Sequence, residues 1–414
     1  MGVVKSVATN LLELPPSPFR FCVVNLGCKV NRVESDSIAV SLMALGGVAA
    51  SEREASIIIV NTCTVTGEAD KKARKAVRHA LKTAPNALVY VTGCAVAIDK
   101  SEYISIDSRI RVVDRLSLLD ELARRSESSL RIGGEFRTRI NIKVQDGCDR
   151  ACTYCIVHVA RGRARSMPYE QVIAEAKAYI SAGAKEIVLA GIDLGSYRDG
   201  DRRLHHLVRE LVEISDRMAV PGDVPARIRA SSLEPVTIDD AFIDILANAD
   251  GRLCRHLHLP VQSGSTKVLR EMARPYTAVE FERLVDRLYE RVPRLSLTTD
   301  IIVGFPGETD DDFEMTMQLA RTCRFSKIHV FPYSMREGTP AAQRIDQVSP
   351  DVKMERAARL RELSDELRAQ DYARRMGTTE YCIIEPDSAL TESYHEISVP
   401  LHAEIGSLIP VFLS

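Results

Sequence analysis

The sequence predicts an α/β protein with an N-terminal sheet of parallel strands, a central partial barrel and a small C-terminal antiparallel β unit. Short apolar strands alternate with amphipathic helices over most of the 414 residues, which is typical of parallel sheets. Six strand–helix units follow one another in the middle of the chain, too few for a closed eight-stranded barrel. The length suits two or three domains. We place the domains at 19–130, 135–348 and 376–414, with a linker helix at 349–375.

The N-terminal domain is expected to have strands near residues 21–24, 56–60 and 87–91. One helix should begin at about Ser35, and a second helix should cover 68–81. Cys28, Cys63 and Cys94 each follow the carboxyl end of one strand, the edge where open parallel sheets bind ligands. We predict that the three thiols share a metal site. The alternative is three unrelated buried cysteines.

The central domain repeats a strand followed by a helix. Strands are expected near 140–145, 186–190, 227–231, 256–260, 296–303 and 327–331. Helices are expected at 169–182, 204–219, 238–249, 278–290 and 308–323, the last with Thr309 as its N-cap. Functional residues of such folds lie on the loops that follow the strands. The compact set Cys148, Cys152 and Cys155 directly follows the first strand, at that end.

The C-terminal stretch alternates apolar and polar residues near 381–384, 397–399 and 408–412, which predicts a small antiparallel sheet. From Met376 onward it contains six acidic residues and neither Lys nor Arg. Neutralising phosphates requires cations. We therefore expect this unit to pack against the rest of the chain, or to contact bases through groups such as Tyr394, rather than to hold RNA by charge.

The overall charge and hydropathy exclude several classes of protein. With 55 Lys and Arg against 57 Asp and Glu, any nucleic-acid surface must be a local patch. No run approaches the roughly 20 apolar residues that span a bilayer, so we expect no membrane partner. The first 19 residues do not fit a secretory signal. We expect a cytoplasmic, reducing compartment, in which the ten cysteines stay free.

Three thiolates within eight residues can surround one metal centre, and soft sulfur ligands select zinc or iron–sulfur clusters. Zinc is a genuine alternative, because His158 follows Cys155 by three residues and Cys3His is a known structural zinc set. A [4Fe–4S] cluster held by three cysteines leaves one iron open for a substrate. That arrangement suits a loop at the functional end of a barrel.

The segment 145–166, which begins QDGCDRACTYC, resembles the cluster loop of radical S-adenosylmethionine (SAM) enzymes, and more narrowly the methylthiotransferase family. Further segments resemble that family's signatures in the same order: LGCKVN at 26–31, NTCTVT at 61–66, TGC at 92–94, LAGID at 189–193, SSLEP at 231–235, LPVQSGS at 259–265 and TDIIVGFPGE at 299–308. Together they cover about residues 20 to 400. The residues KVN at 29–31 and TVT at 64–66 are most similar to those of the branch that acts on N6-threonylcarbamoyladenosine 37 of tRNA.

The resemblance implies a tRNA (N6-threonylcarbamoyladenosine(37)-C2)-methylthiotransferase with two [4Fe–4S] clusters. Residues matching Cys148, Cys152 and Cys155 hold the cluster at which SAM is cleaved to a 5′-deoxyadenosyl radical. Those matching Cys28, Cys63 and Cys94 hold a second cluster, which carries the inserted sulfur. The implied partners are tRNA, a low-potential electron donor and a sulfur donor. The C-terminal unit resembles a TRAM domain, a small RNA-binding β barrel.

The remaining candidate site residues fall into two groups. Expected SAM contacts, between the last two loop cysteines or after strand ends, are Tyr154, Gly191, Asp193, Ser232, Glu234 and Gln262. Expected substrate contacts are Lys71, Arg74, Lys75 and Arg78 on one helix face, the arginines Arg161, Arg163 and Arg165, and Asp300. For the four cations of the helix, the alternative is a solvated helix face, and for the three arginines it is salt bridges within the barrel. Tyr154 could instead pack within its loop, and Asp300 could cap a loop.

Two other functions compete with this hypothesis. The same chemistry could act on a ribosomal-protein side chain or on another modified adenosine. A non-catalytic, zinc-binding RNA-interaction protein would also use clustered cysteines, and its metal content would be zinc without iron.

Overall fold

The computed structural model of the chain describes residues 11–126, 139–400 and 402–414. It consists of two compact units. The first extends to Gly133 and also includes Val159–Arg161, and the second contains the rest of the chain. The predicted domain boundary at 130–135 lies outside the described residues. Within the described ranges, no helix combines the length and the apolar character needed to cross a bilayer.

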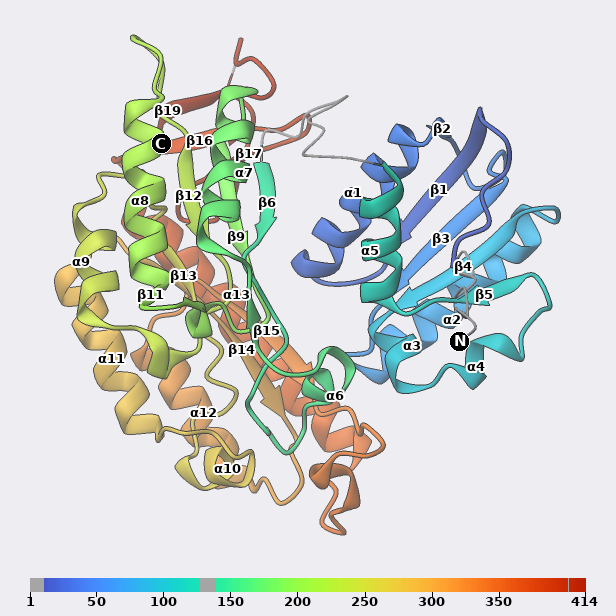
Figure 1. Ribbon diagram of the computed structural model, residues 1–414. Helices are drawn as coiled ribbons and strands as arrows, with labels where there is room; N and C mark the ends of the chain where they lie inside the picture. The colour runs from blue at the N-terminus through green and yellow to red at the C-terminus, as the bar shows by residue number, and fades with distance from the viewer. Residues whose placement is uncertain (1–10, 127–138, 401) are drawn as a thin grey trace. The chain divides into compact units, whose positions relative to one another are not determined.

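The first unit is built around a five-stranded, fully parallel sheet (Figure 1). Its strand order β2-β1-β3-β4-β5 corresponds to Gly47–Ala49, Phe19–Asn25, Ile57–Thr62, Leu88–Gly93 and Ile110–Val112. Its helices are α1 (Lys29–Ala44), α2 (Gly67–Thr83), α3 (Cys94–Ile98), α4 (Ser101–Ile104) and α5 (Arg115–Ser126). Every residue of β3 is buried, because Ile58 and Val60 pack in one apolar cluster and Ile57 and Ile59 in another.

The N-terminal unit differs from the sequence prediction at the start of α1, at the edges of the sheet and in helices α3, α4 and α5, which were not predicted. Helix α1 begins at Lys29 instead of Ser35, because the chain turns into the helix directly after Cys28. Its first turns bury the polar side chains of Asn31 and Glu34, so no apolar period marks them in the sequence. The sheet also has two short edge strands, β2 and β5, that were not predicted.

The second unit contains the predicted partial barrel. Its six parallel strands are β6 (Arg139–Lys143), β9 (Glu186–Ala190), β12 (Arg227–Ala230), β13 (His256–His258), β14 (Ser296–Val303) and β15 (Lys327–Pro332). They form two three-stranded sheets, which isolated bridges such as Ser232 to His258 connect between β12 and β13. The α/β fold class and all six expected strands are therefore confirmed.

The five expected helices follow the barrel strands, together with two short helices, α6 and α10, that were not predicted. They are α6 (Val157–Arg161), α7 (Tyr169–Ser181), α8 (Leu204–Arg217), α9 (Asp240–Asn248), α10 (Thr266–Glu271), α11 (Ala278–Arg291) and α12 (Asp310–Thr322). Short strands β7 (Gln145–Asp146), β8 (Arg165–Ser166), β10 (Arg198–Asp199) and β11 (Arg202–Arg203) lie in the loops. Thr309 caps α12 by accepting a hydrogen bond from the backbone of Asp312, as predicted. Alternate strand residues, such as Leu297 and Ile301, join the apolar core.

The C-terminal part of this unit is helix α13 (Pro350–Arg375) and a four-stranded antiparallel sheet of order β18-β17-β16-β19. The strands are β16 (Thr379–Ile384), β17 (Ala389–Thr391), β18 (Glu396–Ile397) and β19 (Leu408–Phe412). Arg227 and Arg229 of β12 are buried on either side of Glu186, at 2.7 and 2.8 Å. They also donate to the carbonyls of Tyr381 at 2.6 Å and Glu392 at 2.9 Å, which fixes the sheet to the barrel.

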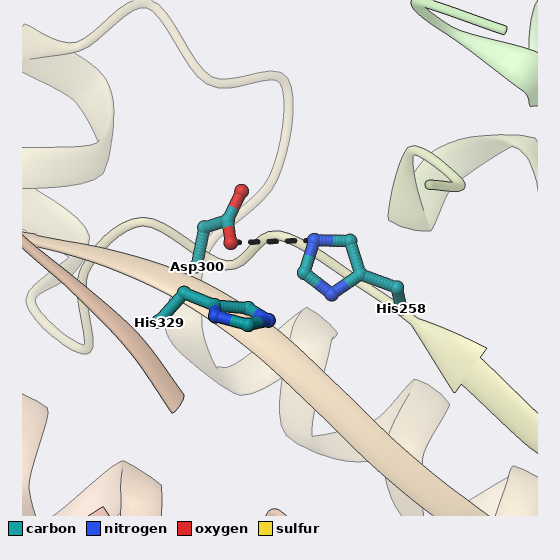
Figure 2. Close-up of side chains that lie close together, drawn as sticks. All are labelled: His258, Asp300 and His329. Carbon is teal, nitrogen blue, oxygen red and sulfur yellow. Dashed lines mark ion pairs between the residues drawn. The ribbon is translucent and has the colours of Figure 1, made fainter. Parts of the chain in front are cut away.

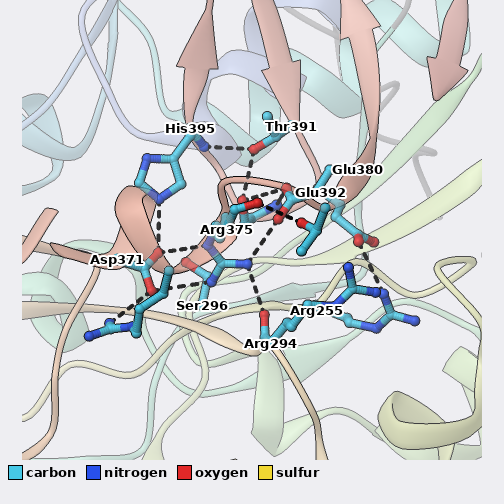
Figure 3. A network of polar contacts seen from close by, with 12 residues as sticks. Arg255, Arg294, Ser296, Asp371, Arg375, Glu380, Thr391, Glu392 and His395 are labelled. Carbon is cyan, nitrogen blue, oxygen red and sulfur yellow. Dashed lines mark hydrogen bonds and ion pairs between the residues drawn. The ribbon is translucent and has the colours of Figure 1, made fainter. Parts of the chain in front are cut away.

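A second polar network strengthens this attachment (Figure 3). Arg375 donates to Asp371 and Glu380, both at 2.9 Å, and to the carbonyl of Arg294 at 2.9 Å. The His395 ring lies 2.8 Å from Asp371. Tyr394 stacks on His256 of β13 with ring centroids 4.7 Å apart. These contacts pack the C-terminal unit against the barrel strands.

Candidate metal centres and cofactor site

The first cysteine trio lies at the carboxyl edge of the N-terminal sheet, as the sequence predicted. Cys28 is the N-cap of α1, Cys63 directly follows β3, and Cys94 directly follows β4 and opens α3. Two buried amides hold the loops together. Asn31 donates to the Asn61 side chain and Asn61 to the Asn31 carbonyl, both at 3.0 Å. The three cysteines are thus positioned by neighbouring strand ends of one sheet.

Gly93 permits the close approach of two of these loops. Its φ of 100° is a conformation that residues with a side chain rarely adopt. A Cβ at this position would lie 2.4 Å from the carbonyl oxygen of Thr62. Glycine is therefore required for Cys94 to follow β4 so close to the end of β3.

Burial raises the pKa of the Cys94 thiol to about 11, and it also raises the pKa of Cys63. The Cys28 thiol raises both pKa values further, whereas the guanidinium of Arg161 lowers them. These mutual effects show that the three thiols and Arg161 share one environment. A bound cation or metal cluster would relieve the cost of ionising the thiols there.

Arg161 was predicted to contact substrate, but it is buried within the first unit. It donates to the side chain of Asn31 at 2.7 Å and pairs with Glu34 at 3.2 Å, and Glu34 also pairs with Arg115 at 2.5 Å. Asn31 in turn accepts from the thiol of Cys28 at 3.3 Å. Arg161 and Glu34 thus hold Asn31, the hydrogen-bond partner of the Cys28 thiol, in place. The sequence analysis did not predict this role.

The second trio lies on the loop between β7 and α6, at the carboxyl end of the barrel. Each sulfur accepts a hydrogen bond. The backbone N–H of Arg150 donates to Cys148 and that of Val157 to Cys155, both at 3.4 Å. The side chain of Arg274 donates to Cys152 at 3.3 Å. Burial raises the pKa of Cys148 to about 11. The hydrogen-bond donors oppose that effect because they stabilise thiolates.

The spacing of the sulfurs distinguishes a single zinc ion from a cluster. A tetrahedral zinc with Zn–S bonds of about 2.3 Å holds its sulfurs about 3.8 Å apart. In the part of the chain that the structure describes, just one group has three ligand atoms of His, Cys, Asp or Glu within 4.8 Å of one another, and it contains no cysteine. Within the described ranges, neither trio brings all three sulfurs within 4.8 Å of one another. Three thiols with N–H donors suit an iron–sulfur cluster.

The predicted SAM contacts come from several strand ends near the second trio. Gln145, which was not predicted, accepts backbone N–H groups of Ile192 and Asp193, both at 2.9 Å, and so fixes the loop that begins at Gly191. Asp193 pairs with Arg150 at 3.2 Å. The backbone of Ser232 forms a bridge with that of His258, and Gln262 donates its backbone N–H to the carbonyl oxygen of Asp300 at 2.9 Å; these two candidates thus follow the ends of β12 and β13.

Arg274 connects the remaining candidates, and no sequence signal singled it out. This buried side chain follows α10 and lies 2.5 Å from Glu234, 2.9 Å from the hydroxyl of Tyr276 and 3.5 Å from that of Tyr154. Burial raises the pKa of Glu234, and the guanidinium of Arg274 opposes this. The cysteine loop, Tyr154 and Glu234 therefore belong to one network that Arg274 holds.

The basic side chains predicted to bind substrate lie mostly on the surface. Helix α2 buries Ala73 and Val77 and leaves the opposite side to the predicted cations Lys71, Arg74, Lys75 and Arg78. Of these, Arg74 pairs with Glu102 at 2.8 Å. Arg163 keeps 91% of its side chain exposed beside Asp149, and Arg165 is half exposed near Asp146. These positions leave the cations available to a polyanion.

Comparison with known proteins supports the assignment of both units. Residues 142–320 match the Radical SAM superfamily, and residues 20–114 match an uncharacterized protein family, UPF0004. The chain is 38% identical over 393 residues to the threonylcarbamoyladenosine tRNA methylthiotransferase MtaB of Bacillus subtilis (strain 168), covering 90% of this chain and 85% of that protein. It is 33% identical to the tRNA-2-methylthio-N(6)-dimethylallyladenosine synthase of Anoxybacillus flavithermus, covering 89% and 74%.

Among solved structures, the fold is similar to TsrM from Kitasatospora setae, described as a radical S-adenosylmethionine methyltransferase with cobalamin and a [4Fe–4S] cluster bound. The TM-score is 0.54 and the identity is 16%, with 78% of this chain and 77% of that chain covered. This likeness supports the fold of the chain.

Proposed function

We propose, from the premise that this chain belongs to the radical SAM methylthiotransferase family, that it adds a methylthio group to C2 of N6-threonylcarbamoyladenosine 37 in tRNA. The observation that carries the proposal is the presence of two cysteine trios, one at the carboxyl edge of the N-terminal parallel sheet and one on the loop between β7 and α6. Relatives named as threonylcarbamoyladenosine tRNA methylthiotransferases reach 36–38% identity, MtaB of Bacillus subtilis among them, and those named as dimethylallyladenosine synthases 30–35%, which favours this substrate.

Two [4Fe–4S] clusters and SAM are the cofactors of the proposed enzyme. Cys148, Cys152 and Cys155 would hold one cluster, and Cys28, Cys63 and Cys94 the other. When bound, these groups supply one-electron chemistry and a transferable sulfur. The thiols must be deprotonated for binding, and the N–H donors around the second trio favour that state.

The protein's own residues would position these groups. Gln145 fixes the loop that carries Gly191 and Asp193, and Arg274 fixes Glu234 beside Cys152, so the SAM contacts would be preorganised before SAM arrives. Tyr154, partly buried next to the same arginine, would pack on SAM. The exposed cations of α2, with Arg163 and Arg165, would contact tRNA phosphates in the cytoplasm.

Metal content and nucleoside analysis test this proposal. Anaerobically reconstituted protein should contain about eight irons per chain, as two [4Fe–4S] clusters require. Bulk tRNA from a deletion strain should lose 2-methylthio-N6-threonylcarbamoyladenosine and regain it on complementation. Zinc without iron would instead indicate the zinc-binding RNA-interaction protein. An unchanged level of the modified nucleoside, with iron present, would indicate another adenosine or a ribosomal-protein side chain as substrate.

A further inference from the structure

Three ionisable side chains on neighbouring barrel strands converge (Figure 2). His258 on β13, Asp300 on β14 and His329 on β15 each offer a polar atom within 4.8 Å of the other two. The register explains this convergence, because Asp300 pairs directly with His329, and His258 pairs with Thr298, two residues before Asp300. Nε2 of His258 lies 3.3 Å from Oδ1 of Asp300, and the two imidazole rings are 5.6 Å apart.

The three side chains point into the barrel. Their strand neighbours Leu257, Ile301 and Ile328 belong to the apolar core, and side chains alternate between the two faces of a strand. His258 and Asp300 keep 18% and 29% of their side chains exposed, and His329 is exposed. Polar groups of this kind on an inner face are accessible to a ligand that enters the barrel.

Their position within the barrel is next to two expected SAM contacts. The backbone N–H of Leu233 donates to the carbonyl of His258 at 3.0 Å, beside Ser232. On the next strand, the backbone N–H of Gln262 donates to the carbonyl of Asp300 at 2.9 Å. A substrate that reaches the cofactor end of the barrel would therefore meet His258 and Asp300.

We propose that His258, Asp300 and His329 bind the polar substituent on N6 of the target adenosine and select it over an apolar one. The proposal rests on the proposed function. A threonylcarbamoyl group carries a carboxylate, a hydroxyl and urea N–H groups. Imidazole N–H groups suit the carboxylate, and Asp300 can accept from the hydroxyl or from a urea N–H.

The orientation of His258 supports this role. Its Nδ1 lies 2.9 Å from the hydroxyl of Thr298, so the ring is held by the strand next to it. This contact directs Nε2 towards Asp300 and the interior, where the ligand would lie. A ring held in this way loses little freedom on binding.

The same groups explain discrimination against an apolar substituent. A dimethylallyl group would displace water from these three polar side chains and offer them no hydrogen bond in return. Sites built to hydrogen-bond a substrate group reject analogues that lack it by about 10⁴- to 10⁵-fold. Because the chain is similar to enzymes named for each adenosine, local groups such as these must decide between the two substrates.

The test uses the reconstituted holoenzyme and tRNA anticodon stem-loops that carry either threonylcarbamoyladenosine or dimethylallyladenosine. His258→Leu and His329→Leu should lower kcat/KM for the first substrate about 10- to 100-fold, mainly through KM. The ratio of kcat/KM between the two substrates should fall by a similar factor. Circular dichroism and the iron content should match those of the wild type, which shows that the variants are folded and loaded.

The matched control is His205→Leu, because His205 forms a similar pair with Asp239 at 2.8 Å between α8 and α9 and lies on no barrel strand. A wild-type enzyme that is inactive on threonylcarbamoyladenosine would contradict the proposed function. A wild-type enzyme that is active, with trio variants equal to the control, would overturn the inference alone. A stoichiometric zinc or manganese ion that disappears in His258→Leu would also overturn it, because the trio would then be a metal site.

Discussion

The side chain of Arg274 donates a hydrogen bond to the sulfur of Cys152 at 3.3 Å while its other terminal nitrogen lies 2.5 Å from Glu234. Burial disfavours its charge, but Tyr154, Tyr276 and Glu234 outweigh this and raise the pKa of Arg274. A permanently charged group thus joins a proposed cluster ligand to a proposed SAM contact. Its role is to position both.

Replacing Arg274 should separate cluster loading from SAM chemistry. We expect Arg274→Met to retain its iron and sulfide but to cleave SAM about 10- to 100-fold more slowly, the usual cost of losing an outer partner of a metal site. The cluster's reduction potential should also shift, because a charged donor to sulfur is lost. Arg270→Met, at an exposed position of α10, serves as the control. Unchanged SAM cleavage and potential would refute a positioning role.

The two cysteine trios should be separable by mutation. Cys148→Ala should lower the iron content from about eight to about four per chain and abolish SAM cleavage. Cys63→Ala should cause the same loss of iron but leave SAM cleavage largely intact and prevent methylthiolation. Cys323→Ala, which removes a fully buried core thiol, should keep all the iron. Loss of SAM cleavage in Cys63→Ala, with the second trio still loaded, would contradict this division of labour.

Glu186 should be essential for the stability of the second unit. It is completely buried between Arg227 and Arg229, and these arginines hold the pKa of its carboxyl well below its usual range despite burial. Glu186→Gln would leave two buried guanidinium groups without a counter-charge. We expect a loss of about 3–5 kcal/mol in the free energy of unfolding.

The control for Glu186 is Glu385→Gln. Glu385 keeps 39% of its side chain exposed and pairs with Arg139 at 3.2 Å. Exposed pairs contribute about 0–1 kcal/mol. Thermal unfolding and limited proteolysis should show the C-terminal sheet released in Glu186→Gln and retained in Glu385→Gln. Equal effects of the two substitutions would mean that the buried network does not fasten the sheet.

The sequence predicted those parts of the molecule that depend on local patterns. The six barrel strands have apolar periods, and the trio Cys28, Cys63 and Cys94 follows strand ends, which a parallel sheet must bring to one edge. Arg274 could not be found in this way, because its contact with Cys152 joins residues 122 positions apart. Arg227 and Arg229 likewise interrupt the apolar pattern of β12, and only the packed C-terminal sheet explains them.

Glu175 provides a pH-dependent prediction outside the site. Burial in α7 raises the pKa of its carboxyl from 4.5 to about 7, although Lys143 lowers it in part. The unfolded chain ionises this group near 4.5, so ionisation in the folded state costs free energy. The cost is complete above pH 7 and disappears as the pH falls towards 4.5.

Glu175→Gln should therefore stabilise the protein at about pH 8, by at most about 3 kcal/mol, and by clearly less at about pH 5.5. Glu170→Gln, an exposed position on the same helix, should show no such difference between the two pH values. Anaerobic thermal unfolding of the reconstituted protein at both pH values measures the effect. A gain for Glu175→Gln that is the same at both pH values would mean that packing, and not the charge of the buried carboxyl, is responsible.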